Sequence, residues 1–438
     1  MTRKWIIAGA MLVLVLLVCT SGPPASAMPP QAAPTYTMAE YNAYQAAANE
    51  KNAQQRLALL DDFVAKYPKS TLLPYVYRTY YLAYYELKNY PKTIENVDKL
   101  LALGDKLDTG SHLEALTARA QAFFLGSNQK ALGTPEQLSK AGASSVDGLK
   151  VLGQWAKPEN MTPEQYAQQK KSLTVLFNSI AGIASTQLKD YKAAVDAFKA
   201  ALAADPTDAL TSYRLGVAYL QMDPPQYMDG FWAVAHAIAL KVPGDAQVRT
   251  YLRNRLANYQ QTGCDKLLND QMNELLTLAT SSAERPATYK IPSAADLQKA
   301  RDETSNFIMD LKAGGDKAKL LWLAVCGLDF PEVGGKVIEV SSTDNAVVLK
   351  LFFAPTPEEI EAGKVSNMEV KVAGQPEVKR LPVGDGVRFS GTLAGYDPEP
   401  FMLHWEKAKV NPEDIPAEKG QPAKKRPPAK RPAKKTGR

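Results

Sequence analysis

A segment that occurs twice places the strongest constraint on the fold of this chain. Leu87–Tyr90 reads LKNY, and Leu188–Tyr191 reads LKDY 101 residues later, close to three periods of about 34 residues. After the second copy, apolar residues recur at helical spacing until Asp205-Pro206 closes the pattern. The residues that share one helix face are Tyr191, Ala194, Phe198, Ala201 and Leu202. The sequence therefore predicts an array of repeated helices.

A second motif supports the same repeat. Leu215-Gly216 is followed by Tyr219, which gives the spacing L-G-x-x-Y. A glycine at that position admits a packed neighbouring helix, and a large aromatic such as Phe198 fills the gap between small alanines. These features resemble the tetratricopeptide repeat over roughly residues 38–260. The resemblance implies an all-α array that presents a surface to a protein or peptide and performs no chemistry.

The chain is long enough for two or three domains. We expect a multidomain protein in which a repeat array is followed by a small all-β barrel and a disordered basic tail. Within the array, we expect Ser111 to cap a helix and 126–163 to form an irregular hairpin with a looped insertion. We also expect one helix over 294–313 and a polar linker over 281–292. The predicted segments are a signal peptide (1–27), a flexible leader (28–37), the array (38–261), a helical connector (262–328), the barrel (329–410) and the tail (411–438).

The N-terminus has the pattern of a secretory signal peptide. Arg3-Lys4 precedes an apolar run from Trp5 to Val18, and Ala25-Ser-Ala27 supplies a small-residue cleavage site. An uncleaved anchor is the alternative, but the run is shorter than the roughly 20 apolar residues that a membrane span needs. A lipoprotein site at Cys19 is disfavoured because no small residue directly precedes it. We expect cleavage near Ala27 and a periplasmic or envelope-associated mature protein.

The positive charge of the chain is concentrated at its ends. The formal net charge is +6, but 419–438 holds nine basic residues and no acidic ones, and the leader adds Arg3 and Lys4. Without these eleven charges, residues 28–418 carry a net charge of −5. The Lys/Pro/Ala tail cannot bury enough surface to fold, and blocks of basic residues bind polyanions. It serves either as a solubilising tail or as a polyanion-binding segment through Lys424, Lys425, Arg426, Lys430, Arg431, Lys434 and Lys435.

The hydrophobic period changes from 3.6 to 2 after residue 334. A hairpin over 335–353 with a turn at 342–345, and strands at 368–372, 387–393 and 401–405, predict a small barrel with glycine-rich corners. This arrangement resembles an OB-type barrel, which implies binding of nucleic acid or oligosaccharide on its strand face. The alternative, which we favour, is a barrel whose aromatic residues form the core and whose lysines are solvated. If the barrel binds nucleic acid or oligosaccharide, the candidate binding residues are Lys336, Lys350, Phe352, Lys371, Arg380 and Arg388.

A tyrosine-rich helix over 74–87 supplies candidates for partner binding. At helical spacing, Tyr77, Tyr80, Tyr81 and Tyr84 are expected to fill the array interior. The remaining positions fall where repeats of this kind expose the inner face of their first helix, although a merely solvated face explains them equally well. The candidates are Arg78, Tyr85, Glu86, Tyr213 and Gln221.

Cysteines and histidines give no sign of a reactive site. After processing only Cys264 and Cys326 remain, each in an apolar helical context, which favours two buried thiols and leaves a disulfide as the alternative. The histidines His112, His236 and His404 lack metal-ligand spacing. No catalytic or phosphate-loop motif occurs. We therefore expect neither a cofactor, nor a metal, nor an enzymatic activity.

The leading hypothesis is an exported, non-enzymatic adaptor that binds a protein or peptide partner in the cell envelope. The alternative is a polyanion-binding protein that uses the barrel and tail on nucleic acid, anionic lipid or cell-wall polymer. A structural component of a larger envelope assembly is a third class. A small-molecule ligand is disfavoured, and the oligomeric state is left open.

Overall fold

The computed structural model describes residues 35–127, 129–261, 264–342 and 346–417. The chain divides into two compact units: one comprises the residues up to 252 together with 272–290, and the other comprises 253–271 and the residues from 291 onward. The predicted signal peptide, the turn at 343–345 and the basic residues of the tail lie outside the described residues. Among the described helices, none combines the length and apolar character that a membrane crossing requires.

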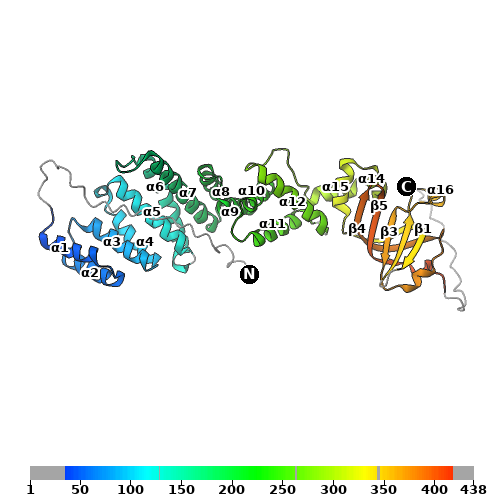
Figure 1. Cartoon of the computed structure of the whole chain (residues 1–438), viewed down its shortest axis with the longest axis horizontal. Coiled ribbons are helices and arrows are strands. Elements are labelled where there is room, and N and C mark those ends of the chain that lie inside the picture. The colour runs from blue at the N-terminus through cyan, green and yellow to red at the C-terminus, as the bar shows by residue number, and fades with distance from the viewer. Residues whose placement is uncertain (1–34, 128, 262–263, 343–345, 418–438) are drawn as a thin grey trace, which may run out of the picture. The chain divides into compact units, whose positions relative to one another are not determined.

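The first unit is built from helices that follow one another in antiparallel pairs, as predicted (Figure 1). From α2 to α10, each helix packs against the helix that precedes it in the chain. The helices are α1 (Met38–Asn49), α2 (Ala53–Lys66), α3 (Leu73–Glu86), α4 (Tyr90–Leu101), α5 (Thr109–Gly126), α6 (Pro135–Gln154), α7 (Pro163–Gln187), α8 (Tyr191–Ala204), α9 (Ala209–Gln221) and α10 (Tyr227–Ala239). Two further helices, α11 (Asp245–Gln260) and α12 (Asp265–Ser281), each contain a boundary between the units.

The repeated LKNY/LKDY segment forms the tight turn inside a helix pair. Leu87 and Leu188 end their helices, and the lysines that follow take the left-handed conformation, with φ of 55° at Lys88 and 65° at Lys189. The next residue caps the second helix, since the side chain of Asn89 or Asp190 accepts a hydrogen bond from a backbone N–H of its first turn. The motif therefore encodes a helix end, a reversal and a helix start in four residues.

Close packing between helices requires glycine at several positions. A Cβ at Gly216 would lie 2.6 Å from Cγ2 of Val234 on α10, which confirms that this glycine admits a neighbouring helix. In the same way, a Cβ at Gly182 would lie 2.4 Å from the ring of Phe198. These contacts explain why the small-residue positions recur with the repeat period.

Three local predictions are wrong. Residues 135–154 form one regular helix, α6, where we expected a looped insertion; its Gly148 is required because a Cβ there would lie 2.5 Å from the ring of Phe177. Asp108 caps α5 in place of Ser111, since the chain enters the helix three residues earlier. The predicted helix over 294–313 breaks into α13 (Ala294–Asp302) and α14 (Phe307–Ala313), because Asn306 caps a new helix.

The polar segment after α12 packs against α10. Arg285 Nε donates a hydrogen bond to Asp229 Oδ1 at 2.9 Å, and the Tyr289 ring meets Trp232 edge-on at 5.5 Å between centroids. Burial, with the charge of Glu274 adding to it, raises the pKa of Tyr289 to about 12. This segment is therefore part of the fold of the first unit.

The second unit contains the predicted barrel. Its five strands are β1 (Asp329–Ser342), β2 (Val347–Phe352), β3 (Met368–Val372), β4 (Gly386–Pro398) and β5 (Phe401–Val410). They close in the order β1-β2-β3-β5-β4, with β3 and β5 parallel and the other pairs antiparallel. This is the OB-like arrangement that we expected. Strands β1, β4 and β5 are longer than predicted, because bulges allow them to curve around the barrel.

The barrel core is aromatic at its centre and is closed by helices. Trp405 is fully buried, and the rings of Phe330 and Phe389 meet it edge-on. Apolar residues of α14 and of α15 (Gly315–Val325) pack into the same core, among them Leu311 and Leu321. A short helix, α16 (Pro357–Ala362), lies between β2 and β3 in the chain.

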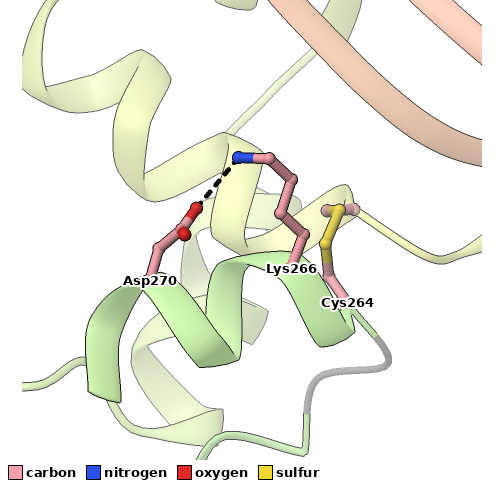
Figure 2. Close-up of a disulfide and its surroundings, with 4 residues drawn as sticks. Cys264, Lys266 and Asp270 are labelled. Carbon is pink, nitrogen blue, oxygen red and sulfur yellow. Dashed lines mark hydrogen bonds and ion pairs between the residues drawn. A yellow bond between two sulfur atoms is a disulfide. The ribbon is translucent and has the colours of Figure 1, made fainter. Parts of the chain in front are cut away.

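The two cysteines form a disulfide, so the expectation of two free thiols is wrong. Cys264 precedes α12 and Cys326 ends α15, with a Cα–Cα distance of 5.4 Å (Figure 2). Both are buried, with exposed fractions of 7% and 2%. On the surface of α12 nearby, Lys266 donates a hydrogen bond to Asp270 at 2.9 Å. An apolar helical context is compatible with free thiols and with a disulfide. Which of the two forms depends on whether the ends of α12 and α15 that carry the cysteines lie side by side, and the sequence does not show this.

The predicted start of the tail also needs correction. Residues 411–417 continue from the barrel, with a short 3₁₀ helix over Pro412–Asp414. Arg388 Nη2 lies 2.9 Å from Asp414 Oδ1 and 3.3 Å from Glu413 Oε2, and Ile415 packs against the core. The hydrogen bonds and charge of Asp414 raise the pKa of Arg388. This short segment is held by specific contacts that composition does not reveal.

Candidate functional site

The first helices of successive pairs, α3, α5, α7 and α9, form one side of the array, which we call the first-helix face. Helix α7 contacts both α5 and α9. Between α3 and α5, the carboxylate of Glu114 accepts hydrogen bonds from the Tyr81 hydroxyl at 2.7 Å and from Arg78 Nε at 2.9 Å. Burial tends to lower the pKa of Arg78, but the hydrogen bond and charge of Glu114 outweigh it and raise that pKa.

The structure places four of the five predicted partner-binding residues in contacts within the array. Arg78 pairs with Glu114 at 2.8 Å, and Glu86 pairs with Arg56 at 3.0 Å. The ring of Tyr85 meets that of Tyr90 edge-on at 6.0 Å. A similar contact at 6.0 Å joins Tyr213 to Tyr251, while Gln221 is half-buried at the end of α9. These residues are not gathered into a single site.

Arg214 on α9 is the residue of this face that the sequence analysis did not single out. Its guanidinium lies over the ring of Phe124 on α5, with 5.6 Å between Cζ and the ring centroid. No residue that the structure describes forms a hydrogen bond or an ion pair with Arg214. Burial lowers the pKa of Arg214 to about 10, against the opposing effect of Asp208.

The guanidinium of Arg214 forms no ion pair with a carboxylate of the described residues. The carboxylate that acts on it, Asp208, already caps α9 by accepting hydrogen bonds from two backbone N–H groups and the Thr211 hydroxyl. A guanidinium presents five N–H donors in a planar fork suited to a carboxylate. Arg214 and Phe124 can therefore hold an anionic group against an aromatic floor. Sequence position alone could not pair them, because 90 residues separate them.

A cavity of about 410 Å³ lies elsewhere in the array, between α2, α3 and α4. Tyr77, Tyr80 and Tyr84 of α3 line it, together with polar residues of α2 and α4. The prediction that four tyrosines of α3 fill the interior is right for Tyr80 and Tyr81, which are buried, whereas Tyr77 and Tyr84 are half-buried at the cavity. The spacing of the tyrosines indicates that they share one face of α3. It does not indicate that α2 and α4 leave a cavity over that face.

Most of the barrel residues proposed for polyanion binding have partners within the barrel. Lys336 donates to backbone oxygens of Glu361 and Gly363, Lys350 pairs with Glu339 at 2.9 Å, and Lys371 lies 3.9 Å from Glu406. Phe352 packs so closely over Gly363 that no Cβ would fit there, and Arg388 is paired as described above. Arg380 is exposed at the end of a 3₁₀ helix. The charges of Lys350, Lys371 and Arg388 are thus balanced by neighbouring carboxylates.

No group of three or more side chains within the described ranges is arranged to hold a metal ion. His404 lies between two carboxylates of the barrel surface, 2.8 Å from Asp397 and 3.5 Å from Glu369. His236 is bonded to the backbone oxygen of Ala279 at 2.9 Å.

Comparisons with known proteins add little to this picture. No protein-family model matches the chain, and no curated protein matches it by sequence. Solved structures that it resembles include the MamA protein (16% identity, 51% of this chain and 98% of that one, TM-score 0.30) and PilW, described as a widely conserved type IV pilus biogenesis factor (16%, 56% and 99%, TM-score 0.29). A thermophilic TPR protein of Thermus thermophilus matches at 16% identity over 50% of this chain and 98% of its own, with a TM-score of 0.25. These scores are too low for a function to be transferred from any of them.

Proposed function

We propose that this chain is an exported, non-catalytic scaffold whose helical array holds an acidic segment of a protein partner on the first-helix face. The observation that carries this proposal is the guanidinium of Arg214, stacked on Phe124 and unpaired among the described residues. A partly buried charge without a counter-ion costs free energy, and the carboxylate of a partner would offset that cost. Helical repeat arrays offer extended surfaces of this kind to their partners.

Export is supported by two independent features. The N-terminal residues have the pattern of a cleavable signal peptide, and Cys264 and Cys326 are joined in a disulfide. Disulfides persist in oxidising compartments such as the bacterial periplasm. The barrel part of the polyanion-binding alternative receives less support, because most of its barrel residues are paired internally.

The partner can be identified by crosslinking and then tested by affinity. A photo-crosslinking amino acid in place of Val217, one helical turn beyond Arg214, should capture the protein bound to this face in intact cells. The purified partner should then bind the Arg214→Gln variant at least about tenfold more weakly than wild type, because a charge-assisted hydrogen bond is lost. Arg249→Gln is the matched control, since Arg249 pairs with Asp245 on the surface of α11. Equal losses in the two variants would contradict the proposal.

Export has its own test. Fractionation of cells followed by N-terminal sequencing should find a mature chain that begins at Met28 outside the cytoplasm. A cytoplasmic chain that retains the first 27 residues would contradict this part of the proposal and leave the partner-binding part standing.

A further inference from the structure

The cavity between α2, α3 and α4 is built by one face of each helix. Helix α2 contributes Asp61, Val64 and Ala65, and α3 contributes the three tyrosines at positions 77, 80 and 84. Helix α4 contributes residues at positions 92, 95, 96 and 99, which recur at helical spacing. Helix α3 packs against both α2 and α4, so its tyrosines form the floor of the gap between them. The volume, about 410 Å³, is within the range of small-ligand sites.

The floor of the cavity is a row of three tyrosine rings, and one of their hydroxyls, that of Tyr80, is hydrogen-bonded within the protein. The ring of Tyr80 lies 6.5 Å from Tyr77 and 6.4 Å from Tyr84, nearly parallel to the latter. The Tyr80 hydroxyl donates a hydrogen bond to Asp61 Oδ1 at 2.6 Å, which fixes the carboxylate at the cavity wall. Burial, with this hydrogen bond adding to it, raises the pKa of Tyr80. The floor therefore combines aromatic carbon with neutral phenol groups.

The α4 wall offers donors and acceptors whose charges cancel. Glu95 accepts hydrogen bonds from Lys92 at 2.6 Å and Lys99 at 2.9 Å. With Asp61, the lining thus holds two carboxylates and two ammonium groups. Asn96 is only 4% exposed; its Nδ2 donates to the Lys92 backbone oxygen, while its Oδ1 accepts no hydrogen bond from any described residue. Since Asn96 lines the cavity, its amide oxygen can accept a hydrogen bond from a ligand bound there.

We propose that this cavity binds a neutral saccharide unit of a glycan. The balanced wall disfavours a ligand with net charge, and its four charged side chains and the amide of Asn96 disfavour a purely apolar one. A sugar ring offers hydroxyls to donors and acceptors alike and packs its C–H face on aromatic carbon. The proposal is independent of the protein partner assigned to the first-helix face, because the lining residues of the cavity include neither Arg214 nor Phe124.

The test uses the full mature chain and neutral oligosaccharides as probes: chitotetraose, cellotetraose, maltotetraose and a mannan tetrasaccharide. At least one should give a saturable response in NMR titration. Its affinity should be about three- to tenfold weaker for Asn96→Ala and for Tyr84→Phe, since each change removes a hydrogen-bonding group. Tyr75→Phe is the control, because Tyr75 lies on the same helix, is 56% exposed and does not line the cavity. Circular dichroism should show unchanged folding of all three variants.

Salt dependence distinguishes this ligand from a charged one. Affinity for a neutral sugar should change less than about twofold between low salt and physiological salt, because no counter-ions are exchanged. The proposal is overturned if none of the four probes binds saturably, if Tyr75→Phe weakens binding as much as Tyr84→Phe, or if the cavity variants instead weaken binding of the crosslinked protein partner.

Discussion

The ring of Phe198 occupies the place that a side chain at Gly182 would need: its Cε1 lies 2.4 Å from the position of a Cβ there. Phe198 is buried in α8, and Gly182 lies on the preceding helix, α7. The same relationship joins Gly148 of α6 to Phe177 of α7. Successive helices of the array thus approach closely by pairing an aromatic residue with a glycine.

Gly182→Ala should destabilise the array. Because the ring must shift to admit the added methyl group, we expect the free energy of unfolding to fall by about 1–3 kcal/mol. Gly153→Ala is the control: it lies in α6 with no atom within 4 Å of the added Cβ, and alanine should raise the stability by about 0.5–1 kcal/mol. Urea denaturation followed by circular dichroism measures both. Similar values for the two variants would contradict this account of the packing.

Reduction of the disulfide should destabilise the second unit. Cys264 and Cys326 are 62 residues apart, and the loop that they close in the unfolded chain is worth about 4 kcal/mol of stability. Replacing both by serine should lower the melting temperature of the barrel transition by about 8–16 °C. A reducing agent should do the same to wild type but leave the double variant unaffected. A barrel transition that is insensitive to reduction would show that the bridge is absent in solution.

Arg214→Met should stabilise the array while it weakens partner binding. The substitution removes a desolvated charge that has no counter-ion among the described residues and keeps the contact with Phe124, so we expect a gain of about 1 kcal/mol. Arg119→Met is the contrasting change. Arg119 is largely buried, pairs with the half-exposed Asp98 at 2.7 Å and donates to the Lys140 backbone oxygen and to Ser144, so removing these hydrogen bonds should cost about 1–3 kcal/mol. Thermal denaturation of the two variants compares them directly, and a loss of stability in both would contradict the role assigned to Arg214.

Asp108→Ala should cost about 1 kcal/mol at neutral pH, because Asp108 caps α5. A hydrogen bond from the Ser111 hydroxyl, together with backbone N–H groups, holds the pKa of Asp108 below its ordinary value of 3.8. Since the folded state favours the ionised form, this stabilisation is complete above pH 3.8 and is lost as the pH falls through the lower folded pKa. Stability measured between neutral and strongly acidic pH should therefore converge for the two proteins. Ser111→Ala should cost less than Asp108→Ala; the reverse order would restore Ser111 as the cap.

Truncation should locate the true end of the folded barrel. A chain that ends at residue 417 should keep the melting temperature of the full chain. A chain that ends at residue 410 loses the contacts of Arg388 with Asp414 and of Ile415 with the core, and it should be about 1–2 kcal/mol less stable. Equal stability of the two truncated chains would show that these contacts contribute nothing.

The sequence was informative wherever a structure depends on neighbours in the chain. The turn at Leu188–Tyr191 follows from a left-handed lysine and an Asp cap, all within four residues. The alternation of strand β2 was likewise predicted from adjacent residues. The prediction was wrong at α6, whose glycines suggested a loop. Gly148 is needed there because the ring of Phe177 on the neighbouring helix packs against it, and this contact cannot be seen from adjacent residues.

Contacts between distant segments were decided by the tertiary structure. The bridge between Cys264 and Cys326, the stacking of Arg214 on Phe124 and the cavity over the α3 tyrosines each join helices that are far apart in sequence or separated by a turn. The amino-acid order alone determined that this chain forms helical pairs and then a closed barrel, because hydrophobic period and caps act over a few residues. Which side chains meet was determined by how the helices pack, since that geometry depends on all of them together.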